Sequence, residues 1–460
     1  MSVLRARVAT ETYLKDLRVS MASLLPDQGL ALIEQGRRWS DRMLTICGLL
    51  WTLVAGRTLS ERFCAARDGV VRMYASRQRP GDTYEGFIKA LAARTDALAD
   101  MLIEHFRVRM EQLAGDCWKI GKFIVFAADS SKLDLPMTKA NEQAFELASR
   151  DKSWPQMLLG TLIHLGTGLP WSWRLGKATD SERTLLRRML DDLPPHVLLV
   201  ADAGFVGFDL IKTILSFGHQ TLIRGGANIK LIEKLGCDIR EYEGGIIYLW
   251  PDKKRRAGMT PLILRKVVVI DGRNRRMVLL TSVLDAQELS DSEIARLYGL
   301  RWGIELFYRT LKQTLGHSKL RSCSPDNALV EGQWMMLGIW MLGLMMLKAR
   351  DPEVSPDRQS AALALGAVRE SASGRPCTLT GPRHPRLGRE RYKRRPRHRA
   401  RLQQALRAAL KDSYQRTRTK TARHWPDKKK ARPPGEPKAR MAKTFEVRRA
   451  NELISSRPAK

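Results

Sequence analysis

The sequence predicts a mixed α/β core that follows an α-helical region and precedes a strongly basic tail. Short apolar segments typical of strands alternate with helical segments between residues 118 and 224. Residues 226–285 are rich in strand-like segments, and strand signals are scarce before residue 118. These observations predict a helical N-terminal region over 1–117, a core over 118–350 with a β-rich insertion at about 226–285, a linker over 351–374, and a basic, largely disordered tail over 375–460.

The N-terminal region is predicted to be helical because its apolar residues recur at helical intervals. Leu91, Leu98, Met101, Leu102 and Phe106 are spaced by one, three, four and seven residues, which places them on one face of a helix.

Two strands of the core end in an acidic residue. The apolar segment FIVFAAD is predicted to end at Asp129, and HVLLVAD is predicted to end at Asp202. Further strands are expected at 156–165 and 169–175, joined as a hairpin, and at 220–224. Helices are expected at 182–193, after a capping signal, and at 208–218, with Gly218 as the cap at its end.

The insertion and the helices after it complete the core. Strands are expected at 243–250, 261–270 and 276–284, and residues 291–315 are predicted to form one long helix. The longest apolar run, residues 334–347, is shorter than the ~20 residues that a membrane-spanning helix needs. It is therefore predicted to be a buried helix of the core, and no membrane association is expected.

The charge distribution predicts a nucleic-acid partner. The formal net charge is +32, and residues 375–460 hold 28 Lys and Arg against 6 Asp and Glu. Each phosphate that a basic side chain neutralises releases a counterion and so strengthens binding. The six cysteines are scattered without a CxxC pair, which argues against zinc sites and disulfides and favours a reducing compartment.

The predicted helix over 291–315 carries a group of residues suited to a phosphodiester. Tyr298, Arg301, Glu305 and Lys312 fall within about 60° on the helical wheel and span about 21 Å along the helix. A carboxylate can bind a metal ion, while the phenol and the two cations can hold phosphates.

The pattern Tyr298-x2-Arg301-x3-Glu305-x6-Lys312 resembles, in spacing and identity, the Tyr-Arg-Glu-Lys signature of the insertion sequence four family of DDE transposases. The segment that starts at Asp129 resembles the family's first aspartate motif, with Ser130 in place of the usual Gly. The DAGF segment at Asp202 resembles the second, with Ala203 replacing an Arg.

The resemblance covers roughly residues 118–350 and implies a ribonuclease H-like catalytic core with a β-rich insertion. It implies that Asp129, Asp202 and Glu305 are the catalytic residues and metal ligands. It also implies a cofactor of two Mg²⁺ ions, for which Mn²⁺ can substitute. Two such ions can clamp the attacking and leaving oxygens of an in-line displacement.

The function implied is cut-and-paste transposition, in which DNA is cleaved at the element ends and then joined to target DNA. The expected partners are double-stranded DNA with terminal inverted repeats, target DNA, and a second copy of the chain in a homodimer on DNA. The expected location is the cytoplasm, in association with the nucleoid. DNA contacts are expected from Tyr298, Arg301 and Lys312, and from a basic cluster in the insertion, Lys253, Lys254, Arg255 and Arg256. We assign recognition of the DNA sequence to the helical N-terminal region.

Three other interpretations stay open. A metal-dependent nuclease could use the same carboxylates without joining DNA ends, and strand-transfer products would separate the two. A non-catalytic nucleic-acid-binding protein would explain the charge but would leave the Asp–Asp–Glu pattern to chance. A decayed transposase copy is disfavoured because the carboxylates and the helix signature are all retained.

Overall fold

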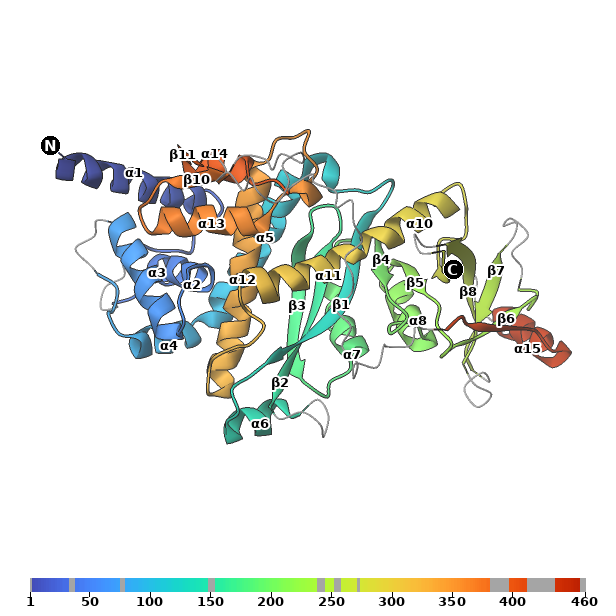
Figure 1. Ribbon diagram of the computed structural model, residues 1–460. Helices are drawn as coiled ribbons and strands as arrows, with labels where there is room; N and C mark the ends of the chain where they lie inside the picture. The colour runs from blue at the N-terminus through green and yellow to red at the C-terminus, as the bar shows by residue number, and fades with distance from the viewer. Residues whose placement is uncertain are drawn as a thin grey trace, which may run out of the picture.

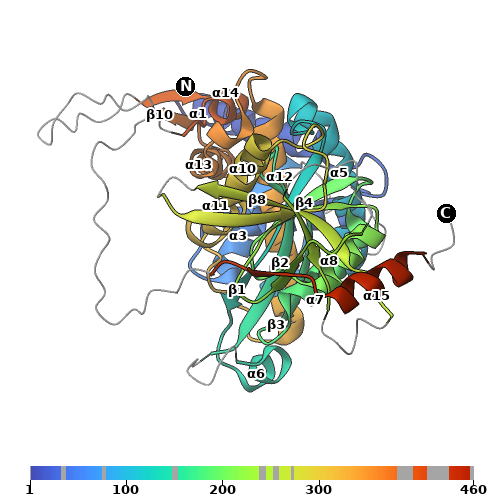
Figure 2. The same cartoon turned by 90° about the vertical axis from the view of Figure 1, so that its right-hand side faces the viewer.

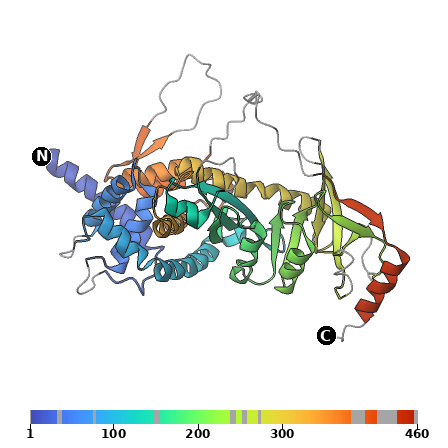
Figure 3. The ribbon, with the colours of Figure 1, turned by 90° about the horizontal axis from the view of Figure 1, so that it is seen from below.

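The computed structural model describes residues 2–32, 38–74, 79–147, 154–237, 245–251, 258–270, 274–380, 397–411 and 435–455. The described chain is elongated, with a helical region at one end and the β-rich insertion at the other (Figures 1 and 3). A mixed α/β core lies between them, as the alternation of strand and helix segments predicts.

One ten-stranded sheet runs through the core and the insertion, in the order β12-β6-β7-β8-β9-β5-β4-β1-β2-β3. In the core, β4 pairs in parallel with β1 and β5, while β2 pairs antiparallel with β1 and β3. The core strands are β1 (Ile124–Asp134), β2 (Gln156–His164), β3 (Leu169–Lys177), β4 (Val197–Ala201) and β5 (Gln220–Arg224).

The insertion extends this sheet, because its last strand pairs antiparallel with β5. Its strands are β6 (Lys230–Glu233), β7 (Ile246–Leu249), β8 (Leu262–Ile270) and β9 (Arg276–Thr281). The sequence prediction missed β6, whose four residues are too few for a clear alternation of apolar and polar side chains.

A buried helix joins the core to the N-terminal region. The long apolar helix α12 (Pro325–Ala349) packs against α2 (Asp41–Leu53) and α5 (Thr95–Ala114). Among the described residues it is the single helix long and apolar enough to cross a membrane, but 89% of its most apolar window is buried inside the protein. The other helices of the N-terminal region are α1 (Ser2–Ala22), α3 (Leu59–Met73) and α4 (Tyr84–Ala92).

Helices of the core connect and cover the strands. They are α6 (Lys139–Phe145), α7 (Glu182–Arg187), α8 (Phe208–Ser216), α10 (Asp291–Leu300) and α11 (Trp302–Arg309). The helix predicted over 182–193 is shorter than expected, because α7 ends at Arg187. The side chain of Ser181 makes no capping hydrogen bond at its start.

The prediction of a linker over 351–374 is wrong. This segment holds helix α13 (Ala361–Ala372), which packs against α1 and α12. Val368 and Ala364 are fully buried there. The short apolar stretch finds its partners on segments far away in the sequence, so its local composition does not reveal them.

The described parts of the basic tail are folded rather than disordered. They form β10 (Cys377–Thr380), β11 (Arg397–Ala400), α14 (Leu402–Arg407), β12 (Lys438–Met441) and α15 (Thr444–Ser455). Helix α14 packs on α13, whereas β12 pairs in parallel with β6 at the edge of the main sheet. The view of Figure 2 shows α15 at the insertion end of the molecule. The tail therefore contacts both ends of the protein.

Buried neutral histidines predict that mild acid destabilises the protein. His164 is fully buried, and its ring nitrogens bond the Thr167 hydroxyl and the Trp118 carbonyl. Burial lowers the pKa of His164 to about 4, below its ordinary value of 6.5. Below pH 6.5 the unfolded chain therefore binds a proton that the folded chain excludes, and stability falls until about pH 4.

His164 is expected to lower the free energy of unfolding by about 2 kcal/mol between pH 7 and pH 5. Urea unfolding of the native protein and of His164→Gln at both pH values measures it. The variant should lose less stability on acidification than the native protein. Equal losses in the two proteins would contradict the assignment.

Candidate active site

The register of the sheet brings Asp129 and Asp202 to neighbouring strands. The parallel pairing of β1 with β4 ends at Ala128 and Ala201, so each aspartate directly follows the paired residues, Asp129 within β1 and Asp202 just after the end of β4. Asp129 does not end β1 as predicted. The strand runs on to Asp134, because the residues after Asp129 continue to pair with β2.

Each aspartate is half-buried and is held by a backbone amide close to it in the chain. The amide of Ser130 donates to Asp129 Oδ1 at 2.8 Å, and the amide of Gly204 donates to Asp202 Oδ1 at 2.8 Å. These bonds orient the carboxylates at the end of the parallel pair.

The pKa of Asp129 depends on the charge of Asp202. This pKa is raised from 3.8 to about 6, chiefly by burial and also by the negative charge of Asp202, against the Ser130 amide, which lowers it. Glu182 also raises the pKa of Asp129, and Arg301 lowers it. Asp129 thus lies in a concentration of negative charge, an environment that favours a cation.

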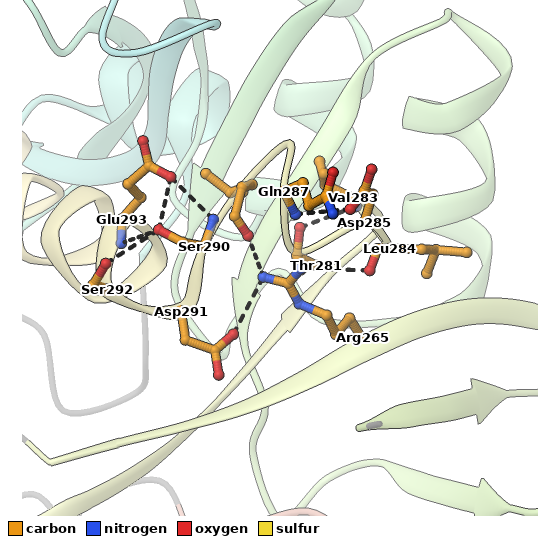
Figure 4. Close-up of polar contacts among 11 residues, drawn as sticks. Arg265, Thr281, Val283, Leu284, Asp285, Gln287, Ser290, Asp291, Ser292 and Glu293 are labelled. Carbon is orange, nitrogen blue, oxygen red and sulfur yellow. Dashed lines mark hydrogen bonds and ion pairs between the residues drawn. The ribbon is translucent and has the colours of Figure 1, made fainter. Parts of the chain in front are cut away.

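The predicted long helix begins at a firmly anchored first turn (Figure 4). The Ser290 hydroxyl accepts from the Glu293 amide at the start of α10, and the Glu293 carboxylate accepts from the Ser290 amide, which completes a capping box. Arg265 of β8 is almost fully buried and bonds the Leu289 carbonyl and, at 3.3 Å, the Asp291 carboxylate. The insertion therefore holds the helix that carries the sequence motif.

The sequence predicts one continuous helix over 291–315, and this prediction is wrong. The helix is interrupted at Arg301, between α10 and α11, and ends in a π-helical turn over Thr310–Thr314. A π-turn changes the angle per residue, so the wheel calculated for an ideal helix does not hold for Lys312. Nζ of Lys312 instead donates to the carbonyl of Lys132 in β1 at 2.6 Å.

Glu305 is paired with an arginine of its own helix. Arg301 Nη2 lies 3.0 Å from Glu305 Oε1, and the guanidinium carbon lies 5.6 Å from the ring centroid of Tyr298. Arg301 is also close enough to Asp129 for each to influence the other's pKa. The arginine thus pairs with the glutamate and also acts electrostatically on Asp129.

Sequence reasoning missed two residues near this centre. The hydroxyl of Tyr308 on α11 donates to the carbonyls of Asp129 at 3.0 Å and of Leu159 at 3.2 Å, which ties the helix to β1 and β2. The carboxylate of Glu182 on α7 raises the pKa of Asp129, and Asp202 raises that of Glu182. Tyr308 follows Glu305 by three residues and so shares its face of the helix, a signal that could have identified it.

The donor atoms fit a hard divalent cation better than a soft one. Asp129, Asp202, Glu182 and Glu305 offer carboxylate oxygens, the ligands that Mg²⁺ prefers. Within the described part of the chain, however, no three acidic, histidine or cysteine side chains are grouped closely enough to hold a metal ion. In this arrangement Glu305 is paired with Arg301 and is not grouped with the two aspartates.

The predicted basic cluster of the insertion, Lys253, Lys254, Arg255 and Arg256, lies outside the described residues. The neighbouring Trp250 is buried, and its indole donates to the Met259 carbonyl at 2.6 Å. This tryptophan therefore packs within the insertion.

Comparison with known proteins identifies the part of the chain that contains this site. Residues 121–342 match a family model described as a transposase DDE domain. The chain is 27% identical over 211 residues to the Escherichia coli (strain K12) protein "Transposase InsG for insertion sequence element IS4", an alignment that covers 44% of this chain. That alignment spans 47% of the relative, so about half of the relative's length is matched.

Among solved structures, the chain is similar to the piggyBac transposase in a synaptic complex with hairpin DNA, determined by cryo-electron microscopy. The TM-score is 0.37 with 14% identity, over 79% of this chain and 72% of the other. A TM-score this low does not establish a common fold.

Proposed function

Because this chain belongs to the DDE transposases, in the family of insertion sequence element IS4, we propose that it cleaves DNA at the ends of a mobile element and joins the freed ends to target DNA. The observation that carries the proposal is the pair Asp129 and Asp202, on adjacent parallel strands inside the matched domain. The substrates would be terminal inverted repeats and target DNA, bound by a homodimer in the bacterial cytoplasm, in association with the nucleoid.

We infer a ribonuclease H-like core for the catalytic domain. The strand order β3-β2-β1-β4-β5 supports it, with β1 at the centre and the antiparallel strands on one side. The insertion between β5 and α10 interrupts this core before its last helices, as the resemblance implies.

Asp129, Asp202 and Glu305 would hold the divalent metal, for which we propose two Mg²⁺ ions. Bound there, the metal would polarise the scissile phosphate and activate the attacking oxygen. Glu305 would have to exchange its ion pair with Arg301 for the metal, which would leave the guanidinium of Arg301 free to bind a phosphate. Arg301 lies close enough to the carboxylates of Glu305 and Asp129 for both to raise its pKa, which supports this exchange.

We propose that Tyr298, Arg301 and Lys312 contact the DNA backbone beside the metal site. Lys312 also donates a hydrogen bond to the Lys132 carbonyl of β1, so it would both contact DNA and hold the helix against the sheet. The helical N-terminal region would recognise the terminal repeats, and the basic tail would bind DNA without sequence preference.

The joining of DNA ends separates this proposal from a metal-dependent nuclease. Purified protein is incubated with a duplex that carries the terminal inverted repeat flanking the coding sequence, with a supercoiled target plasmid, and with Mg²⁺ or Mn²⁺. A transposase joins the 3′-hydroxyl of a pre-cleaved repeat to the plasmid. Cleavage of the uncut duplex without joined product, at several metal concentrations, would favour the nuclease.

Replacement of Arg301 by methionine is expected to weaken binding to any duplex about tenfold, since a charge-assisted hydrogen bond contributes roughly 1.5 kcal/mol. The loss should be equal for specific and random sequences, because a phosphate contact positions DNA without distinguishing bases. Fluorescence anisotropy with Ca²⁺ in place of Mg²⁺ measures it, because Ca²⁺ also binds carboxylates but does not adopt the strict octahedral geometry of Mg²⁺. Arg296→Met, on the exposed face of α10, is the control. A loss confined to the terminal repeat would contradict a phosphate contact.

A further inference from the structure

An arginine on α7 holds the loop that follows Asp202. Nε of Arg183 donates to the Gly204 carbonyl at 2.8 Å, and Nη2 donates to the Val206 carbonyl at 2.9 Å. A Cβ atom on Gly207 would lie 3.2 Å from Nη1, so the guanidinium also packs against the start of α8. One side chain therefore spans the whole loop from Gly204 to Gly207.

The same loop fixes the orientation of the Asp202 carboxylate. Gly204 donates its amide to Asp202 Oδ1 at 2.8 Å, and its carbonyl receives Arg183. The Phe205 amide donates back to the Asp202 carbonyl at 3.2 Å, and the Phe205 side chain is buried. Gly204 is thus the direct link between the guanidinium and the carboxylate.

The loop contains no cation of its own. Its sequence is Asp202-Ala-Gly-Phe-Val-Gly207, and Ala203 is buried. Two carbonyls that point toward the same side need donors spaced by a rigid group. The planar guanidinium supplies them in a fixed fork, which a single ammonium cannot do.

We propose that Arg183 is a positioning residue for Asp202, which holds the carboxylate in the orientation that the divalent metal requires. The inference rests on the proposed function, because it gives the metal site of that function a supporting residue. Arg183 does not touch the reacting atoms. It acts through Gly204, in the way that residues behind metal ligands orient them.

The test compares Arg183→Met and Arg183→Lys with the native protein. The control is Arg187→Met, which removes an arginine from the other end of the same helix. Mn²⁺ binding is measured by electron paramagnetic resonance without DNA, the unfolding free energy by urea, and cleavage of the terminal-repeat duplex across Mn²⁺ concentrations.

Arg183→Met is expected to bind Mn²⁺ between about 10 and 100 times more weakly, the usual effect of losing a residue behind a ligand. Its cleavage rate should recover as Mn²⁺ is raised, its KM for DNA should stay unchanged, and Arg183→Lys should fall between it and the native protein. Arg187→Met should match the native protein.

Native Mn²⁺ affinity in Arg183→Met would overturn the proposal, as would a loss of cleavage that Mn²⁺ does not restore. If Arg183→Met does not fold, Arg183→Lys decides by the same criteria. Mn²⁺ binding by Asp202→Asn distinguishes a wrong role for Arg183 from a wrong proposed function. If Asp202→Asn also binds Mn²⁺ with native affinity, the proposed metal site is wrong. If Asp202→Asn loses Mn²⁺ binding while Arg183→Met keeps it, only the role of Arg183 is wrong.

Discussion

Replacement of Asp202 by asparagine is expected to lower DNA cleavage by at least about a thousandfold, since the metal contributes several kcal/mol to the transition state. Asparagine keeps the size of the side chain and can still accept the Gly204 amide, so the fold and the loop should survive. Asp129→Asn and Glu305→Gln should have similar effects. DNA binding by each variant should stay within a few-fold of the native value.

The measurement is single-turnover cleavage in Mg²⁺ with anisotropy binding in parallel. Asp191→Asn removes a charge from an exposed aspartate of the same domain and is the matched control. A variant that cleaves at near the native rate is not a metal-site residue. For Glu305 that result would indicate that the pair with Arg301 is its only role, and Glu182 would then be the next carboxylate to replace.

Substitution of the basic residues between 412 and 434 by glutamine is expected to flatten the salt dependence of DNA binding strongly. Each lost phosphate contact removes about 0.9 from the slope of log K against log[salt], so full engagement of the set predicts a change of roughly 7. The residues are Arg416, Arg418, Lys420, Arg423, Lys428, Lys429, Lys430 and Arg432.

Substitution is a sharper test than removal of the whole tail. Leu402 and Leu406 are buried, and Arg401 forms an ion pair with Asp16 of α1, so truncation at residue 374 would expose apolar surface and leave Asp16 without this partner. A charge-preserving exchange of the four arginines for lysine should leave the slope unchanged. Equal slopes for the glutamine variant and the native protein would indicate that these residues do not contact DNA.

Elements whose information is local could be predicted from the sequence. The apolar segments that became β2, β4 and β5 were located nearly to the residue, because a continuous apolar run bounded by turn residues is a strong strand signal. The predicted start of α10 at residue 291 is confirmed, and the capping bonds between Ser290 and Glu293 that stabilise it form within one turn. The sequence motif likewise identified Asp129, Asp202 and Glu305 as candidates.

Elements whose stability comes from distant partners could not be predicted. Helix α13 was taken for a linker and the described parts of the tail for disorder, since their few apolar residues pack on α1, α12 and the edge strand β6. Strand β1 was predicted to end at Asp129. Its continuation depends on pairing with β2, which apolar spacing along one strand does not encode.

The sequence by itself therefore determined the residue types of the site, because a hard cation needs carboxylates and a phosphate needs cations. Only the tertiary structure decided how they are arranged. The parallel register sets Asp129 beside Asp202, Arg183 and Glu182 approach them from α7, and Arg301 pairs with Glu305. These contacts depend on packing and charge between groups that the fold brings together, so the pattern of residues along one segment does not reveal them.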